Sequence, residues 1–214
     1  MNDHPRYGYS SCSWLLKTHF KKESCDHSVI LMKEKQITIL GVGNILFTDE
    51  GVGVRVLERV KEQYDFPPNV ALVDGGVLGM NLLGTISEAD HLIVIDAVRN
   101  GQAPGTLYRL QGEEIPQRVL AKNSLHQVDL LEALTFCSAL DKHPETLIVG
   151  IEPEDIKTVG LEMTPVVAKK IETMVEMVIM ELNLLGVEAS RRSVPVESDS
   201  EKHSENQAFG VPKI

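Results

Sequence analysis

The sequence predicts an α/β fold: a single three-layer domain with a mostly parallel, twisted, five-stranded sheet and helices on both of its faces. Three observations predict it. Short apolar runs alternate with longer segments of helical periodicity through residues 35–186. The run Leu92-Ile93-Val94-Ile95 is apolar at every position, as expected of a central strand that is covered on both faces. The chain has 214 residues, 43% of them hydrophobic, which suits one domain with extensions.

The first half of the domain is divided by glycine, proline and acidic residues into five expected elements. In order, they are strand 36–42, helix 51–65, strand 70–73, helix 79–88 and strand 92–95. The first helix places Val52, Val56 and Val60 on one face, and Pro67-Pro68 separates it from the second strand.

The second half continues the alternation with four more expected elements. They are strand 105–110, helix 124–140, strand 147–151 and helix 165–185. The first of these strands alternates in polarity, which indicates an edge or antiparallel position. Ser124 with Gln127 three residues later forms a capping-box pattern, and Thr164-Pro165 places proline at the first position of the last helix.

The two ends of the chain differ in composition from the domain. Residues 1–34 form an N-terminal extension without clear periodicity, and residues 187–214 form a polar C-terminal tail rich in serine and glutamate. We expect the first to be flexible and the second to be disordered. The sequence from Met32 resembles an ordinary protein start, so residues 1–31 are either the product of an upstream start codon or a genuine arm.

Charge and cysteine usage exclude several classes of protein. The net charge of −10 falls entirely on residues 35–186, so the domain lacks the basic surface that nucleic acids require. No apolar run reaches the length of a membrane helix, and the N-terminus does not have the pattern of a signal peptide, so we expect a cytosolic protein. The cysteines, Cys12, Cys25 and Cys137, have neither zinc-site nor disulfide spacing.

A glycine-rich loop connects the first strand with the first helix. Gly41-Val42-Gly43 ends the strand, Gly51-Val52-Gly53 opens the helix, and Asp49-Glu50 lies between them. Such loops often bind nucleotide phosphates, but two carboxylates would repel a phosphate. The third position of the dinucleotide fingerprint is also Leu46 rather than glycine. The loop therefore indicates a cation site in preference to a nucleotide site.

Three acids follow three successive strands of the predicted sheet: Glu50, Asp74 and Asp96. Ligands of open α/β sheets bind at this carboxyl-terminal edge. His126 lies in the first turn of a predicted helix, where the helix dipole disfavours a charged imidazole. Glu50, Asp96 and His126 would together form an oxygen and nitrogen ligand set for a divalent transition metal. The alternatives are a helix-dipole role for Glu50, turn-capping roles for Asp74 and Asp96, and a solvated or structural His126.

A series of motifs through residues 35–186, in order, resembles the hydrogenase maturation protease family. The motifs are Gly41-Val42-Gly43-Asn44-Ile45-Leu46, Asp49-Glu50-Gly51-Val52-Gly53, Asp74-Gly75-Gly76, His91-Leu92-Ile93-Val94-Ile95-Asp96-Ala97, Pro104-Gly105-Thr106, Ser124-Leu125-His126-Gln127, Val149-Gly150-Ile151-Glu152-Pro153 and Leu161-Glu162-Met163-Thr164-Pro165. Val77 stands where family members often have threonine, so no hydroxyl role is expected there.

The resemblance implies an endopeptidase that removes a short C-terminal peptide from the precursor of a nickel–iron hydrogenase large subunit. It implies that Glu50, Asp96 and His126 are the catalytic and metal-contacting residues. Nickel is then recognised in the substrate precursor rather than held tightly by the enzyme. The precursor is the expected partner, and the enzyme is expected to be a monomer.

Two other functions remain open from the sequence. A non-catalytic nickel-binding or delivery protein on the same fold would use the same three side chains and leave the precursor uncut. A nucleotide-binding α/β protein would need the glycine-rich loop to hold phosphate, which the acidic pair opposes.

Overall fold

The computed structural model describes residues 34–76, 82–112, 114–115 and 125–193, and of residues 125–131 it describes the backbone alone. A five-stranded sheet forms its centre, with strand order β3-β1-β4-β6-β5. The strands are β1 (Ile37–Val42), β3 (Val70–Gly76), β4 (His91–Ala97), β5 (Leu107–Gln111) and β6 (Glu145–Ile151). All neighbours pair in parallel except β5, which is antiparallel to β6 at the edge. The predicted mostly parallel sheet and its antiparallel strand are confirmed.

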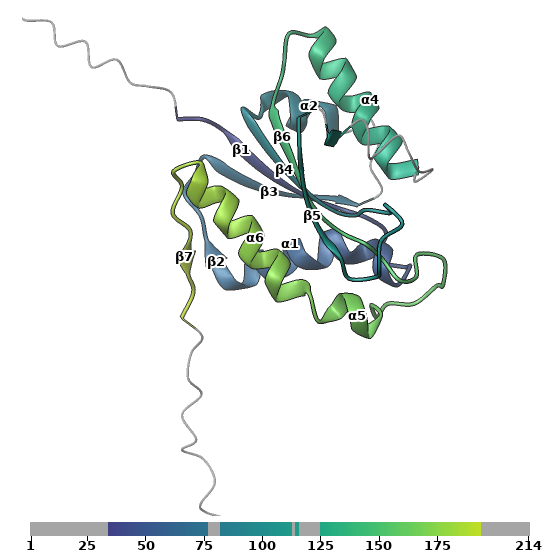
Figure 1. Ribbon diagram of the computed structural model, residues 1–214. Helices are drawn as coiled ribbons and strands as arrows, with labels where there is room; N and C mark the ends of the chain where they lie inside the picture. The colour runs from purple at the N-terminus through teal and green to yellow at the C-terminus, as the bar shows by residue number, and fades with distance from the viewer. Residues whose placement is uncertain (1–33, 77–81, 113, 116–124, 194–214) are drawn as a thin grey trace, which may run out of the picture. The chain divides into compact units, whose positions relative to one another are not determined.

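Helices cover both faces of this sheet, which confirms the three-layer α/β prediction (Figure 1). The helices are α1 (Val52–Gln63), α2 (Leu83–Glu88), α4 (Leu125–Ala139), α5 (Pro165–Ala168) and α6 (Ile171–Leu184). One face packs against α1 and α6, and the other against α2 and α4. The predicted helix 79–88 is confirmed from Leu83 onward, and its first residues lie outside the described part of the chain.

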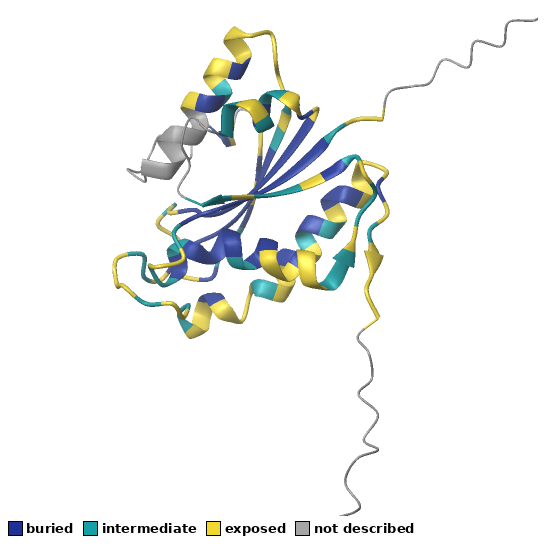
Figure 2. Cartoon of the chain, turned by 180° about the vertical axis from the view of Figure 1, so that it is seen from behind, coloured by how far each residue is buried: buried dark blue, intermediate teal, exposed yellow. Residues whose placement is uncertain are grey.

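The core is aliphatic and is divided by the sheet into two clusters (Figure 2). Every residue of β1 and β4 is buried, as their predominantly apolar sequences predict. Cys137 lies in the cluster beneath α4, where burial raises the pKa of its thiol and makes it a structural residue rather than a nucleophile.

Edge strand β5 is tied to α6 by one ion pair. Arg109 donates from Nε and Nη2 to the two carboxylate oxygens of Glu181, at 2.6 and 2.9 Å. Glu181 is buried, so this bidentate contact satisfies a carboxylate that would otherwise be costly to remove from water. The pair fixes the antiparallel strand against the helical layer.

The prediction of one continuous last helix was wrong. The chain forms α5 and α6, separated at Lys169–Lys170, where the Lys170 amide bonds to the carbonyl of Val167 three residues back. This tighter turn redirects the helix axis. The apolar positions continue across the break, with Val167 and Met174 both in the core, so periodicity alone does not reveal it.

The chain beyond Gly186 is more ordered than predicted. Ser190–Arg191 forms strand β7 against β2 (Tyr64–Asp65), Arg192 pairs with Asp65, and Val187 is buried. The predicted disordered tail is therefore wrong for these residues, because pairing with β2 satisfies backbone groups that the sequence pattern left unassigned. Residues 194–214 and 1–33 lie outside the described chain, so the predictions for them stay predictions.

None of the helices in the described ranges is long and apolar enough to cross a membrane. The longest, α4, has 15 residues.

Glycines allow α1 to begin directly on the ends of β1 and β4. A Cβ atom added to Gly53 would lie 2.1 Å from the carbonyl oxygen of Ile95 and 2.3 Å from that of Val42. A Cβ on Gly41 would lie 2.6 Å from the carbonyl oxygen of Gly53. The first turn of α1 therefore touches the backbone of two strands, which only glycine permits.

We predict that Gly53→Ala lowers the free energy of unfolding by about 2 kcal/mol or more, because backbone must move to admit the methyl group. Gly84→Ala is the matched control: it also lies in a helix, but an added Cβ meets nothing within 4 Å. That variant should be neutral or stabilised by up to about 1 kcal/mol. Urea unfolding of both proteins tests the contrast, and equal stabilities would contradict the close approach of α1.

Candidate functional site

Asp96 lies at the carboxyl-terminal end of β4, between the ends of β1 and β6. It pairs with Gly150 of β6, and the preceding Ile95 pairs with Gly41 of β1. Its side chain is buried, and its Oδ1 accepts a hydrogen bond of 2.8 Å from the Ala97 amide. The carboxylate is thus held at the middle of the sheet edge, where the sequence predicted a functional acid.

Glu50 lies at the same edge. It is the central residue of a 3₁₀ turn, η1 (Asp49–Gly51), which packs beside β4 and leads into α1. Gly43 makes this possible: its φ is +131°, and a Cβ there would lie 1.8 Å from the carbonyl oxygen of Glu50. The structure therefore places the predicted residues Glu50 and Asp96 at one edge of the sheet.

His126 lies in the first turn of α4. Because α4 ends a few residues before β6 begins and runs back along the sheet, its first turn lies toward the carboxyl-terminal edge (Figure 1). The imidazole is among the side chains outside the described set. In the part of the chain that is described, no three histidine, cysteine or carboxylate side chains form a metal-ligand cluster.

Asp74, at the end of β3, stabilises a turn, which is the structural alternative that the sequence analysis gave for this residue. Its Oδ1 accepts a hydrogen bond of 2.9 Å from the Gly76 amide, and the Gly76 carbonyl accepts from Gly43 at 2.8 Å. This contact joins the end of β3 to the glycine-rich loop. Asp74 therefore shapes the edge on which Glu50 and Asp96 lie.

Asp49 has a role that the sequence did not reveal. Its side chain is fully buried and accepts four hydrogen bonds. The donors are the amides of Glu154 and Asp155 and both the amide and the hydroxyl of Thr164, at 2.8–2.9 Å. These partners are 105 to 115 residues away in the chain, so no local pattern could identify them. Asp49 fastens the loop that carries Glu50 to the loop before α5.

The same two loops are joined along their backbones. Phe47 and Val159 form an antiparallel bridge, and the Gly160 amide donates to the carbonyl of Leu46 at 3.0 Å. The hydroxyl of Thr48 donates to the carbonyl of Asp155. Residues 44–49 and 154–164 therefore form one hydrogen-bonded unit beside the sheet edge.

Glu152, which follows β6, is a second buried structural acid. Its carboxylate accepts hydrogen bonds from the Tyr108 hydroxyl and from the amides of Asn100 and Gly101. Burial acts to raise the pKa of Glu152, but these hydrogen bonds to the charged form together outweigh it, and the pKa lies below the usual 4.5. The sequence motif contained Glu152, but its spacing did not indicate this set of donors.

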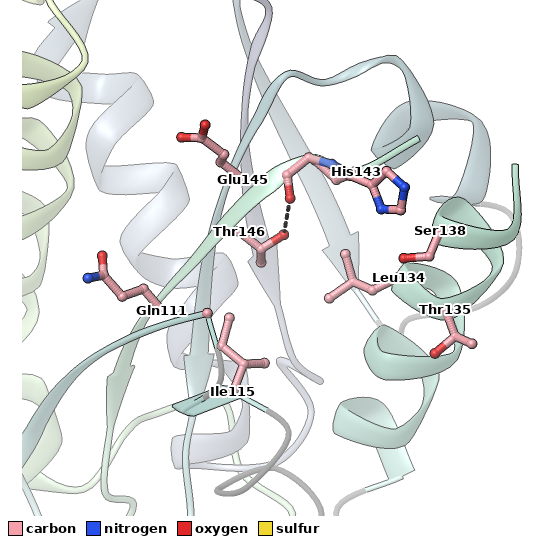
Figure 3. Close-up of a pocket in the computed structure, with 10 residues that line it drawn as sticks. Gln111, Ile115, Leu134, Thr135, Ser138, His143, Glu145 and Thr146 are labelled. Atoms are coloured by element: carbon pink, nitrogen blue, oxygen red, sulfur yellow. Dashed lines mark hydrogen bonds between the residues drawn. The ribbon is translucent and has the colours of Figure 1, made fainter. Parts of the chain in front are cut away.

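A hollow of about 700 Å³ lies at the opposite edge of the sheet (Figure 3). It is lined by the start of β6, the end of β5 and the last turns of α4, with Ile115 and Leu134 on its apolar side. Its ionisable side chains are His143 and Glu145, both exposed. This hollow is distant from Glu50 and Asp96 and does not contribute to their chemistry.

The carboxyl-terminal edge therefore combines two acids with different supports. Asp96 is held by its own strand end, and Glu50 is held by the Asp49 hydrogen bonds and the glycine contacts. Carboxylates placed in this way can bind a cation, orient a water molecule or accept a proton.

Comparison with known proteins links this arrangement to one group of enzymes. Residues 54–181 match the family model described as hydrogenase maturation protease. The chain is 42% identical over 159 residues to the hydrogenase 2 maturation protease of Escherichia coli, covering 73% of this chain and 96% of that protein. It is 38% identical over 172 residues to the hydrogenase expression/formation protein HupD of Bradyrhizobium diazoefficiens, covering 79% and 89%. The solved structure of the hydrogenase maturating endopeptidase HybD from E. coli superposes with a TM-score of 0.71 at 40% identity, covering 73% of this chain and 98% of that one.

We predict that Asp49→Asn lowers the free energy of unfolding by about 2–4 kcal/mol. The Oδ2 of Asp49 accepts hydrogen bonds from three donors, and an asparagine NH₂ in its place would itself be a donor and could not accept them. Glu154→Gln is the control, because this exposed neighbour uses only its backbone in the contact. Chemical unfolding measures both variants, and a loss below about 0.5 kcal/mol for Asp49→Asn would exclude the role given to it.

A lowered pKa in the folded state means that Glu152 contributes stability above its usual pKa and that this contribution is lost as the pH falls through the folded value. We expect Glu152→Gln to be less stable than the wild type by about 1–3 kcal/mol at pH 7. The difference should shrink below about pH 4.5. Urea unfolding between pH 7 and 3 measures it, with exposed Glu88→Gln as the control. A difference that is constant with pH would contradict the assignment.

Proposed function

The chain belongs to the hydrogenase maturation protease family, and we propose that it removes a short C-terminal peptide from the nickel-loaded precursor of a nickel–iron hydrogenase large subunit. One observation carries this proposal. Glu50 and Asp96, which are separated by 46 positions in the sequence, lie at the same carboxyl-terminal edge because η1 packs beside β4. The proposed mechanism uses neither a serine nor a cysteine nucleophile, so a water molecule attacks the peptide bond.

Three side chains are assigned to contact the nickel of the precursor. Glu50 and Asp96 supply carboxylate oxygens, and His126 supplies an imidazole nitrogen from the first turn of α4. A helix N-terminus disfavours the protonated imidazole, which keeps its nitrogen available as a ligand near neutral pH. Such a mixed set suits a divalent transition metal. The metal enters as part of the substrate, and loaded precursors are thereby distinguished from empty ones.

We assign Asp96 to orient the attacking water and to accept its proton. One oxygen of its carboxylate is held by the Ala97 amide, and burial limits competition from bulk water. The water oxygen adds to the scissile carbonyl carbon, the carbon–nitrogen bond then breaks, and the proton passes to the departing amine. Glu50 lies at the same edge of the sheet and receives its position from the neighbouring Asp49.

The intact mass of the large-subunit precursor, after incubation with the protein, tests the proposal. A loss of the C-terminal peptide from the nickel-loaded precursor alone is the expected result. Cleavage of the empty precursor at the same rate would contradict the role of nickel. An unchanged mass of a competent loaded precursor would favour the non-catalytic nickel-binding alternative.

We predict that Asp96→Asn lowers the cleavage rate by about a thousandfold or more while the protein stays folded, because the amide cannot accept the proton of the water. Asp90→Asn is the matched control: Asp90 lies just before the opposite end of the same strand, and its Oδ2 accepts from the Gln36 amide. Cleavage followed by mass spectrometry, with circular dichroism as a folding check, compares the two variants. If the Asp96→Asn variant cleaves the precursor at the wild-type rate, Asp96 is not part of the mechanism.

A further inference from the structure

Four exposed aliphatic side chains lie on the two joined loops beside the proposed active edge. They are Ile45, Leu46, Val159 and Leu161, with exposed fractions of 38, 56, 76 and 64%. We call them the aliphatic rim. The loop from β6 to α5, which carries the last two, is coloured as exposed over much of its length (Figure 2).

The rim is rigidly supported although its side chains are exposed. The Phe47–Val159 bridge and the hydrogen bond from the Gly160 amide to the Leu46 carbonyl hold the two segments side by side. Arg55 of α1 reaches the carbonyl of Leu161 at 3.5 Å. Loops held in this way by their backbones do not need exposed aliphatic side chains for their own stability, so the side chains of the rim are available for contact with a partner.

The rim is continuous with the edge that carries Glu50. Ile45 lies against η1, because a Cβ added to Gly51 would be 2.7 Å from the Ile45 Cα. Asp49, the neighbour of Glu50, is bonded to the loop that carries Val159 and Leu161. A polypeptide whose scissile bond lies at Glu50 and Asp96 would therefore contact the rim with residues on one side of that bond.

We propose that the aliphatic rim is the docking surface for an uncharged, apolar segment of the precursor protein next to the bond that is cut. This inference rests on the proposed function. The four side chains of the rim offer aliphatic carbon to a partner, and such a surface is matched by a segment with apolar side chains at the contacting positions. A second copy of this chain seated there would cover the edge that a protein substrate must reach, which makes the precursor the occupant that is compatible with cleavage.

The test uses the full chain with the double substitution Leu46→Ser and Leu161→Ser. We expect the KM for the loaded precursor to rise by about tenfold or more, because two aliphatic side chains that would be buried in the complex are lost. The kcat and the melting temperature should stay near those of the wild type. Leu184→Ser on α6 is the matched control, since Leu184 is 70% exposed on an element outside the rim. Its KM should be unchanged.

The outcomes separate the two proposals. If the wild type leaves the loaded precursor uncut, the proposed function falls, and the inference falls with it. If the wild type cleaves and the double variant keeps the wild-type KM, the function stands and the docking role of the rim is wrong. A wild-type dimer in light scattering that the double variant converts to a monomer, without a change in KM, identifies a second copy as the occupant and also overturns the inference.

Discussion

The buried carboxylate of Asp49 forms the interactions on which the geometry of the proposed active edge depends. A charge without exposed surface is tolerable only when hydrogen bonds surround it, and Asp49 has four. Its donors all come from the loop before α5, whereas Asp49 itself belongs to the turn that carries Glu50. One side chain thus determines the relative position of two loops that are distant in sequence.

Two further constraints complete this edge. Gly53, in the first turn of α1, has no side chain that would keep the helix away from Ile95 and Val42, so the turn before α1 can lie next to Asp96. Glu152 holds the connection that follows β4 through the amides of Asn100 and Gly101. The two acids proposed to be functional are therefore surrounded by structural acids and glycines, which satisfy requirements of the backbone.

Much of this organisation follows from the sequence. The parallel strands were predicted from short apolar runs that end at glycine or acid, and β5 from its alternating polarity. The placement of Glu50 and Asp96 follows from the rule that parallel strands present their carboxyl ends together. The Asp49 partners could not be predicted, since 105 or more residues separate them from Asp49. The break between α5 and α6 preserves the apolar period, and the ribbon of β2 and β7 has only two residues in each strand, which is too short for any periodicity. The role of the His126 imidazole as a metal ligand stays a prediction.

The ribbon of β2 and β7 has a practical consequence. It holds Arg192 near the end of α1, and Glu34 lies shortly before β1, so the described chain both begins and ends at the amino-terminal edge of the sheet. A strand of six residues spans about 20 Å between this edge and the one that carries Glu50 and Asp96. A surface attachment made at this amino-terminal edge of the described domain would leave the edge with Glu50 and Asp96 facing the solution, which suits the capture of a large protein on a sensor surface.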